Sequence, residues 1–363
     1  MKTRRILHRL LSVHSILIGS LVGLIFWVIP VAAKTPPMMV FASYETNTGT
    51  YPLGVAITNA IESKTGSKIR IVPTMTDAGK AQLLRSKEAH YTIIGGGTAW
   101  FMYSGNADFK TPDWGPQPLR VLWTGGTLGF GFMTRADSGI KQLSDLKGKR
   151  VYYVPGAHGP NSYNEAYLAF GGLTWKDVQQ VKMPSYGAAL KAVKEGAVDG
   201  GATSVTAPGA RELEASNHGL YFLPTPRANK KGWENMLKVA PYWFPDIATT
   251  GAGITPAKPL EMPHYSTFVL AYSWMDDDLA MEITKAINES YDTYSAGMPA
   301  LKRWTMAEFE KQLTNSFMPM HPGTIKYLKQ LGKWTPEFDA WQKKTLAAEA
   351  DRLKQWKAQV GKK

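Results

Sequence analysis

The 363-residue chain contains no cysteine. This absence excludes a disulfide framework, a thiol nucleophile and an anchor made by a lipid-modified cysteine. A chain of this length can bury enough apolar surface to fold without cross-links. If the chain is exported, we therefore expect its mature form to be free in a compartment that retains it, most simply a bacterial periplasm.

Acidic residues are absent before Glu45, whereas the first nine residues carry four basic ones. The apolar run at 16–31 is shorter than the roughly 20 residues of a membrane-spanning helix, and the small residues Ala32 and Ala33 follow it. This order is typical of a secretory signal, so we predict cleavage of residues 1–33 after Ala33 and a mature chain in the periplasm. A retained anchor is the alternative, and Sec and twin-arginine export both stay open.

Basic residues outnumber acidic ones by 42 to 29, which gives a formal net charge of +13. Removal of the four basic residues of the predicted signal leaves +9. No run of basic residues is interleaved with stacking aromatics, so we expect no nucleic-acid partner. A solvated basic surface is the simplest interpretation, and electrostatic steering of an acidic ligand is the alternative.

Motifs of common catalytic sites are missing as well. The chain has no Walker loop, no G-x-S-x-G and no H-E-x-x-H, and its seven histidines lack metal-ligand spacing. The acidic triplet at 276–278 lacks a calcium-loop pattern and fits a helix cap, while His321 fits a structural turn. We therefore expect no catalytic residue, no metal and no cofactor.

What the chain does contain is an alternation of strand and helix patterns. We predict strands at 39–43, 68–72 and 91–94, with helices at 53–63 and 80–87 between them. This β-α-β-α-β order favours an α/β fold with a parallel sheet and helices on both faces. Ligands of such sheets gather beyond the carboxyl ends of the strands.

A second unit repeats the alternation. We predict strands at 119–125, 130–134, 150–154, 178–182 and 198–202. The predicted helices lie between them, at 140–146, 162–170 and 187–195. The segment 223–263 is rich in Pro, Gly, Trp and Lys and predicts long surface loops. A return strand at 265–271, a helix from Asp276 or Asp277 to about 294, and a helical tail at 336–359 follow.

The Gly-rich loop at 155–161 lies between a predicted strand and a predicted helix. Such a loop leaves backbone N–H groups free at a helix N-terminus, where they suit an anionic group. In an exported chain without catalytic motifs, this arrangement favours binding of a small acid over its chemical conversion.

Three segments occur in order along the chain: TGTYPLG at 48–54, ADSGIKQLSDLKGKRV at 136–151 and HPG at 321–323. Together they resemble the TAXI family, the periplasmic solute receptors of tripartite ATP-independent periplasmic (TRAP) transporters. The resemblance covers about residues 39–332. It implies a type II-like binding protein with two α/β lobes, each a mixed sheet flanked by helices, closing on a small organic acid or amino acid. It also implies delivery of that ligand to an integral membrane TRAP permease.

The resemblance and the element order together predict the domain organisation, with a monomeric mature chain. We expect lobe one at 34–126, lobe two at 127–264, a return part of lobe one at 265–333 and a C-terminal helical extension at 334–363.

The family's binding loops map onto four loops of this chain, and the first two precede the helices of the first unit. Loop one offers hydroxyl and N–H groups for a carboxylate from Thr48, Gly49, Thr50 and Tyr51. Helix capping by Thr50 is the alternative role. Loop two contributes Gly79. Its Asp77 would repel an acid if it faced the cleft, and it is better explained as a helix cap or a solvated turn residue.

Loops three and four complete the expected site. Loop three is formed by Gly95, Gly96, Gly97 and Thr98, and its lack of larger side chains predicts a wider pocket. Loop four contributes His158, Gly159 and Asn161, of which Asn161 fits an N-cap and His158 either a surface residue or a donor to the ligand. Thr203 and Ser204, after the last strand of the second unit, are added to the set, with an ordinary turn as their alternative role.

We therefore expect an extracytoplasmic solute-binding receptor and not an enzyme. The alternatives are the binding subunit of an ATP-driven importer, a secreted α/β enzyme acting on a small acid, and a periplasmic sensor module.

Overall fold

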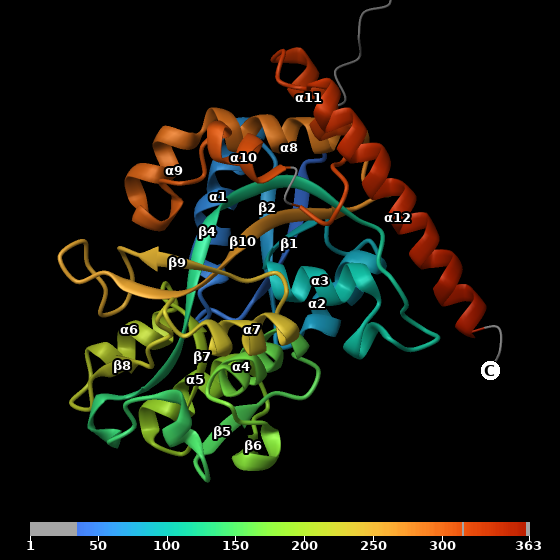
Figure 1. Cartoon of the computed structure of the whole chain (residues 1–363). Coiled ribbons are helices and arrows are strands. Elements are labelled where there is room, and N and C mark those ends of the chain that lie inside the picture. Colours follow the sequence, from blue (N-terminus) through green and yellow to red (C-terminus); the bar gives the residue numbers. More distant parts are fainter. Residues whose placement is uncertain (1–34, 314–315, 361–363) are drawn as a thin grey trace, which may run out of the picture. The chain divides into compact units, whose positions relative to one another are not determined.

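The computed structural model describes residues 35–313 and 316–360, so the predicted signal at 1–33 lies outside the described residues. Ten strands form one mixed sheet in the order β2-β1-β3-β10-β4-β7-β5-β6, with β9 on β10 and β8 on β4 (Figure 1). No helix in this part of the chain is both long and apolar enough to cross a membrane.

The predicted β-α-β-α-β run at the start of the sheet is confirmed. In chain order it consists of β1 (Met38–Tyr44), α1 (Thr50–Thr65), β2 (Lys68–Thr74), α2 (Asp77–Arg85) and β3 (Tyr91–Gly95). The strands pair in parallel. Gly66 ends α1 with a φ of 73°, the left-handed conformation that glycine adopts most easily. We call these elements, α3 (Gly96–Ser104) and the helices that follow β10 the first lobe.

The second unit also has the predicted alternation, and we call it the second lobe. It contains β5 (Arg150–Tyr153), α4 (His158–Phe170), β6 (Gln179–Lys182), α5 (Tyr186–Glu195), β7 (Gly200–Ser204), α6 (Pro208–Glu214) and β8 (Leu220–Phe222). The expected helix at 140–146 is only a short 3-10 turn at Leu143–Leu146. The two-lobed α/β class is thus the observed one.

Two long strands, β4 (Leu119–Arg135) and β10 (Leu260–Tyr272), run between the lobes and pair antiparallel with each other (Figure 1). The expectation of two strands at 119–125 and 130–134 is wrong, because β4 continues through Gly125 and Gly126. A Cβ on Gly125 would lie 2.0 Å from the Trp304 ring, and one on Gly126 would lie 2.3 Å from Arg303. The glycine pair therefore permits close packing on the strand instead of ending it.

The expectation of surface loops at 223–263 is also wrong. The segment forms α7 (Lys230–Val239), β9 (Phe244–Ala248) and the start of β10. Trp233, Met236 and Trp243 are buried, and α7 packs on α4. The apolar residues of this segment therefore serve the core, which its Pro and Gly content does not reveal.

The chain after β10 is helical and returns to the first lobe. It forms α8 (Asp277–Glu289), α9 (Tyr291–Gly297), α10 (Met306–Leu313), α11 (Pro322–Gln330) and α12 (Pro336–Val360). The Asp276 side chain caps α8 as expected, but the helix ends at Glu289 and α9 continues separately. α8 packs on α1 and α11, and α12 is held by a largely buried ion pair between Arg120 and Glu349 at 2.8 Å.

Short 3-10 helices make the remaining connections, at Ala107–Phe109 (η1), Ala136–Ser138 (η2), Leu143–Leu146 (η3), Trp175–Asp177 (η4) and Pro299–Leu301 (η5).

Candidate functional site

Residues from both lobes and both long strands enclose a small cavity, which we call the interlobe cavity. Its volume is about 20 Å³, space for about one water molecule. Six residues of the expected site line it: Thr48, Gly49, Thr50, Gly95, Thr98 and Ser204. The other lining residues are Tyr44, Phe130, Pro160, Tyr163, Tyr186 and Tyr265.

Loop one meets the end of β7 at very close range. A Cβ on Gly49 would lie 1.6 Å from the Ser204 hydroxyl oxygen, so only glycine allows the two lobes to touch here. Thr50 is the first residue of α1, and its side chain makes no capping hydrogen bond, so the alternative capping role is wrong. Among the described residues, the buried Thr50 hydroxyl has no hydrogen-bond partner. It is therefore a donor available to a ligand.

Glycines 95 to 97 do not widen the pocket as expected. Gly96 and Gly97 open α3 directly, without an intervening loop. A Cβ on Gly95 would lie 2.5 Å from the Tyr265 ring, and one on Gly97 would lie 2.5 Å from the Tyr163 ring. The space left by the missing side chains is thus filled by two tyrosine rings.

An aromatic lining is the feature of this cavity that the sequence did not reveal. Phe130 and Tyr163 lie 4.4 Å apart between ring centroids, and Tyr163 stacks on Tyr265 at 5.7 Å. Burial holds the pKa of the Tyr163 and Tyr265 phenols well above the usual range, so both stay neutral. The only sequence signal was the strand pattern, which marks Phe130 and Tyr265 as core residues.

Several expected residues lie outside the cavity lining. Tyr51 faces a groove between α1 and α9, and Gly79 donates its N–H to the Thr76 cap of α2. Thr203 is a buried residue of β7 and accepts a hydrogen bond from Tyr186, so it does not lie in a turn. Asn161 is not an N-cap. It lies in the first turn of α4, where its side-chain amide accepts a hydrogen bond from the Val154 N–H and donates one to the Val154 carbonyl.

Asp77 is fully buried and Thr76 caps α2, so both expected roles of Asp77, helix cap and solvated turn residue, are wrong. Its carboxylate accepts hydrogen bonds from the Gly159 N–H at 2.8 Å and the Thr98 hydroxyl at 3.1 Å. Gly159 belongs to the second lobe, which explains why local sequence gave no sign of this burial. Desolvation raises the pKa of Asp77, and the nearby Lys80 partly opposes that rise.

Lys80 is buried beside the cavity without a hydrogen-bond acceptor in the described part of the chain. Its ammonium lies 3.2 Å from the centroid of the Tyr44 ring, a cation–π contact. Burial lowers the pKa of Lys80 to about 7. A lysine in this state is unusual in a structural core.

Two more carboxylates of the first lobe contact residues at the start of helices in the second. Glu45 accepts from the Ser185 hydroxyl and from the Gly187 N–H at the start of α5, each at 2.9 Å. Asp108 lies 2.5 Å from His158 at the start of α4 and raises the pKa of that imidazole. We call Glu45, Asp77 and Asp108 the acidic clasp. Helix N-termini favour such carboxylates, so the clasp stabilises contact between the lobes.

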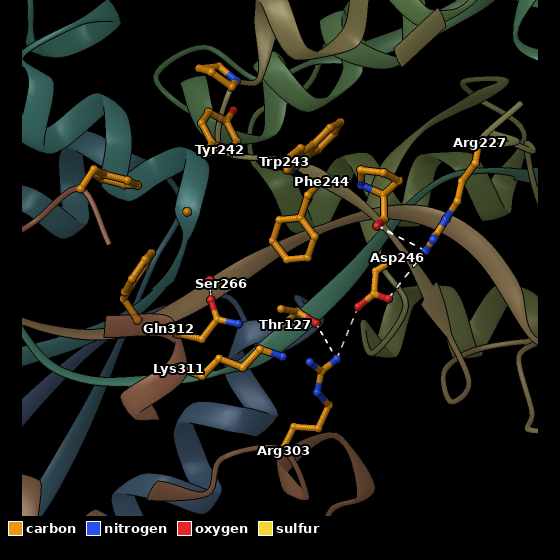
Figure 2. A pocket seen from close by; sticks show the side chains of 15 residues that line it. Thr127, Arg227, Tyr242, Trp243, Phe244, Asp246, Ser266, Arg303, Lys311 and Gln312 are labelled. Atoms are coloured by element: carbon orange, nitrogen blue, oxygen red, sulfur yellow. Dashed lines mark hydrogen bonds and ion pairs between the residues drawn. The ribbon is translucent and has the colours of Figure 1, made fainter. Parts of the chain in front are cut away.

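A second and larger hollow is lined by residues of β4 and β10 (Figure 2). It shares no lining residue with the interlobe cavity. Across residues 35–313 and 316–360, no group of three or more His, Asp or Glu side chains is placed to hold a metal ion.

The model of the NMT1-like family matches residues 45–332 of this chain. Among solved structures, an ancestral arginine-binding protein bound to arginine is 18% identical with a TM-score of 0.44, covering 74% of this chain and 99% of that one. PhnD1 from Prochlorococcus marinus (MIT 9301), in complex with methylphosphonate, is 11% identical with a TM-score of 0.47, covering 82% and 100%. A periplasmic binding protein from Brucella ovis with glutathione bound is 14% identical with a TM-score of 0.46, covering 77% and 74%.

Proposed function

The chain belongs to the NMT1-like family, and on this premise we propose that it is an extracytoplasmic solute-binding receptor. Its ligand is a small organic acid or amino acid, captured between the lobes. After export and cleavage behind Ala33 the receptor works in the periplasm as a monomer.

One observation carries this proposal: loops of both lobes meet at a buried cavity whose available polar group is a hydroxyl donor. The Thr50 hydroxyl lacks a partner among the described residues, and Gly49 and Ser204 bring the two lobes into contact beside it. Binding needs donors and shape, whereas catalysis needs an acid, base or nucleophile aimed at the ligand. The lining offers hydroxyls, phenols and glycines, which favours binding.

The cavity in its present state has room for about one water molecule, so a ligand enters only when the lobes part or the tyrosine rings move. Contacts from both lobes to one ligand exist only after closure. A ligand therefore shifts the population toward a closed state by its extra affinity for that state.

We extend the proposal to the transporter on the resemblance of segments 48–54, 136–151 and 321–323 to the TAXI family. The receptor then delivers its ligand to a TRAP permease, with an ATP-driven importer as the alternative. Its lobes divide at 34–126, 127–264 and 265–333, with an extension at 334–363. Uptake by cells that survives ATP depletion but stops when the ion gradient collapses supports the TRAP assignment, and the reverse result supports the importer.

A secreted enzyme is the second candidate function, favoured by Lys80. A buried lysine with a pKa near 7 is a typical general base or Schiff-base residue. Its ammonium, however, lies over the Tyr44 ring, and Lys80 does not line the cavity. Recovery of the bound molecule unchanged after incubation with pure protein decides for the receptor, and conversion to a product decides for the enzyme.

The binding claim is tested by a thermal-shift screen of amino acids, dicarboxylates and aromatic acids on the mature chain. A ligand at 100 times its dissociation constant raises the free energy of unfolding by about 2.7 kcal/mol. Calorimetry of the hit then compares Thr50→Val, which removes the hydroxyl, with Thr50→Ser, which keeps it.

We expect Thr50→Val to weaken binding by about 1 kcal/mol, the usual net contribution of a hydrogen bond, and Thr50→Ser to bind like the parent. Equal affinity of all three proteins would remove loop one from the site.

A further inference from the structure

The second hollow, which we call the hinge pocket, has a volume of about 500 Å³. This lies within the range of small-molecule sites, roughly 300–1,000 Å³. Thr127 of β4 and Ser266 of β10 contribute to its floor, so the pocket is built on both strands that connect the lobes. Its other walls come from residues 241–246 beside β9 and from the segment at 303–317.

One side of the hinge pocket is aromatic. Phe244, Phe268 and Phe317 line it together with Tyr242 and Trp243. Figure 2 shows the Phe244 ring projecting into the hollow, on the side opposite Lys311. Such a wall offers ring faces and edges to a flat apolar group, and each aromatic contact adds to simple burial.

Basic side chains also line the pocket. Arg227, Arg303 and Lys311 line the pocket, and Asp246 is the single carboxylate among the lining residues. In Figure 2, the Arg303 and Lys311 side chains extend toward the same corner, beside Thr127. Arg303 donates a hydrogen bond of 2.7 Å to the Thr127 hydroxyl, which fixes its position.

The existing ion pairs of these arginines are weak enough to yield to a ligand. Asp246 lies 3.6 Å from Arg303 and 3.8 Å from Arg227, so one carboxylate is shared between two guanidinium groups. Glu308 and Glu261 pair with the same arginines from outside the lining, at 3.2 and 3.5 Å. Partly exposed pairs of this kind contribute only about 0–1 kcal/mol each.

We propose that the hinge pocket is a second ligand site, which takes a carboxylate carried on an aromatic ring. The carboxylate pairs with Arg303, and the ring packs against Phe244, Phe268 and Phe317. A layer of rings separates this site from the interlobe cavity: Tyr242 lines the hinge pocket, Tyr163 lines the cavity, and their centroids lie 6.3 Å apart.

Occupancy of the hinge pocket affects closure, because its floor belongs to the two strands that connect the lobes and its walls to the segments 241–246 and 303–317 on either side of β10. A ligand there has different contacts in the open and closed states, so it couples to binding in the interlobe cavity. The coupling is reciprocal: if an interlobe ligand changes the affinity for the aromatic acid by some factor, the aromatic acid changes the affinity for the interlobe ligand by the same factor.

The test uses benzoate as the probe and isothermal calorimetry of the mature chain, with benzyl alcohol as a neutral probe of similar shape. Arg303→Gln removes the pairing charge. Lys302→Gln makes the same charge change one residue away, outside the pocket lining. Thr50→Val reports on the interlobe cavity, and Phe244→Ala removes the ring wall in case Arg303→Gln does not fold.

We expect one benzoate per chain and at least tenfold weaker binding of benzyl alcohol. Arg303→Gln should lower benzoate affinity about tenfold or more, in line with a hydrogen bond to a charged group. Phe244→Ala should also weaken binding, while Lys302→Gln and Thr50→Val should bind like the parent.

Absence of benzoate binding up to about 10 mM overturns the proposal. Parental affinity in both Arg303→Gln and Phe244→Ala overturns it too. If Thr50→Val lost as much affinity for benzoate as Arg303→Gln, benzoate would bind in the interlobe cavity, and the proposal of a second site would be overturned.

Discussion

Lys80 allows a sharp test, because a buried base with a lowered pKa makes stability depend on pH in a known direction. Its folded pKa is about 7, against an ordinary value of 10.5. Between these values the unfolded chain binds more protons than the folded one, so the free energy of unfolding rises with pH, by at most about 1.4 kcal/mol per unit. From pH 7 to pH 9 the gain amounts to about 2 kcal/mol.

Substitution of Lys80 by methionine removes this pH dependence, since methionine keeps most of the length of the side chain without an ionisable group. It also removes the net cost of the lowered pKa, about 4 kcal/mol at pH 7 from the same two pKa values, in which the attraction of Asp77 is already included. We therefore expect Lys80→Met to be more stable than the parent at pH 7, and this difference to shrink by about 2 kcal/mol at pH 9.

The assay is urea unfolding at pH 7, 8 and 9, followed by tryptophan fluorescence. Lys110→Met, at an exposed position, serves as the matched control and should retain the parental slope with pH. The same slope in Lys80→Met and in the parent would refute the burial of the Lys80 ammonium under Tyr44.

Two further predictions concern contact between the lobes. Gly49→Ala should abolish ligand binding with little loss of stability, because the added Cβ would collide with the Ser204 hydroxyl only when the lobes meet. Calorimetry measures the binding. Gly297→Ala is the control, because a Cβ at that position meets nothing within 4 Å. His158 should titrate above the ordinary pKa of 6.5 in an NMR experiment because of Asp108, so this clasp contact is fully present below pH 6.5 and weakens as pH rises through the folded pKa. Asp108→Asn should return the His158 titration toward its ordinary position, and an unchanged titration would show that the pair does not form.

Much of the fold could be predicted because its signals are local. Pro52 in the first turn and Gly66 after the last delimit α1, and the apolar run ending at Gly95 defines a fully buried strand. Periodic burial of apolar side chains marks the remaining strands and helices of both units in the same way.

Features that depend on distant partners could not be predicted. Gly125 and Gly126 resemble a strand break until Trp304 packs on them. Asp77 has the local pattern of a helix start, and its burial follows from a hydrogen bond to Gly159 of the other lobe.

The site shows the same division between local and distant signals. Glycine and hydroxyl residues near strand ends identified six residues that line the interlobe cavity. Its aromatic wall went unnoticed, because a tyrosine such as Tyr163 or Tyr265 has the same sequence pattern in a core as beside a ligand.

The most direct test of the receptor assignment is a crystal structure of the mature chain with the ligand found by thermal shift. We predict density for one unmodified molecule between Thr50 and the rings of Tyr163 and Tyr265, in an enlarged interlobe cavity. An interlobe cavity that remains at about 20 Å³ with the ligand bound elsewhere, or density for a reaction product, would contradict it.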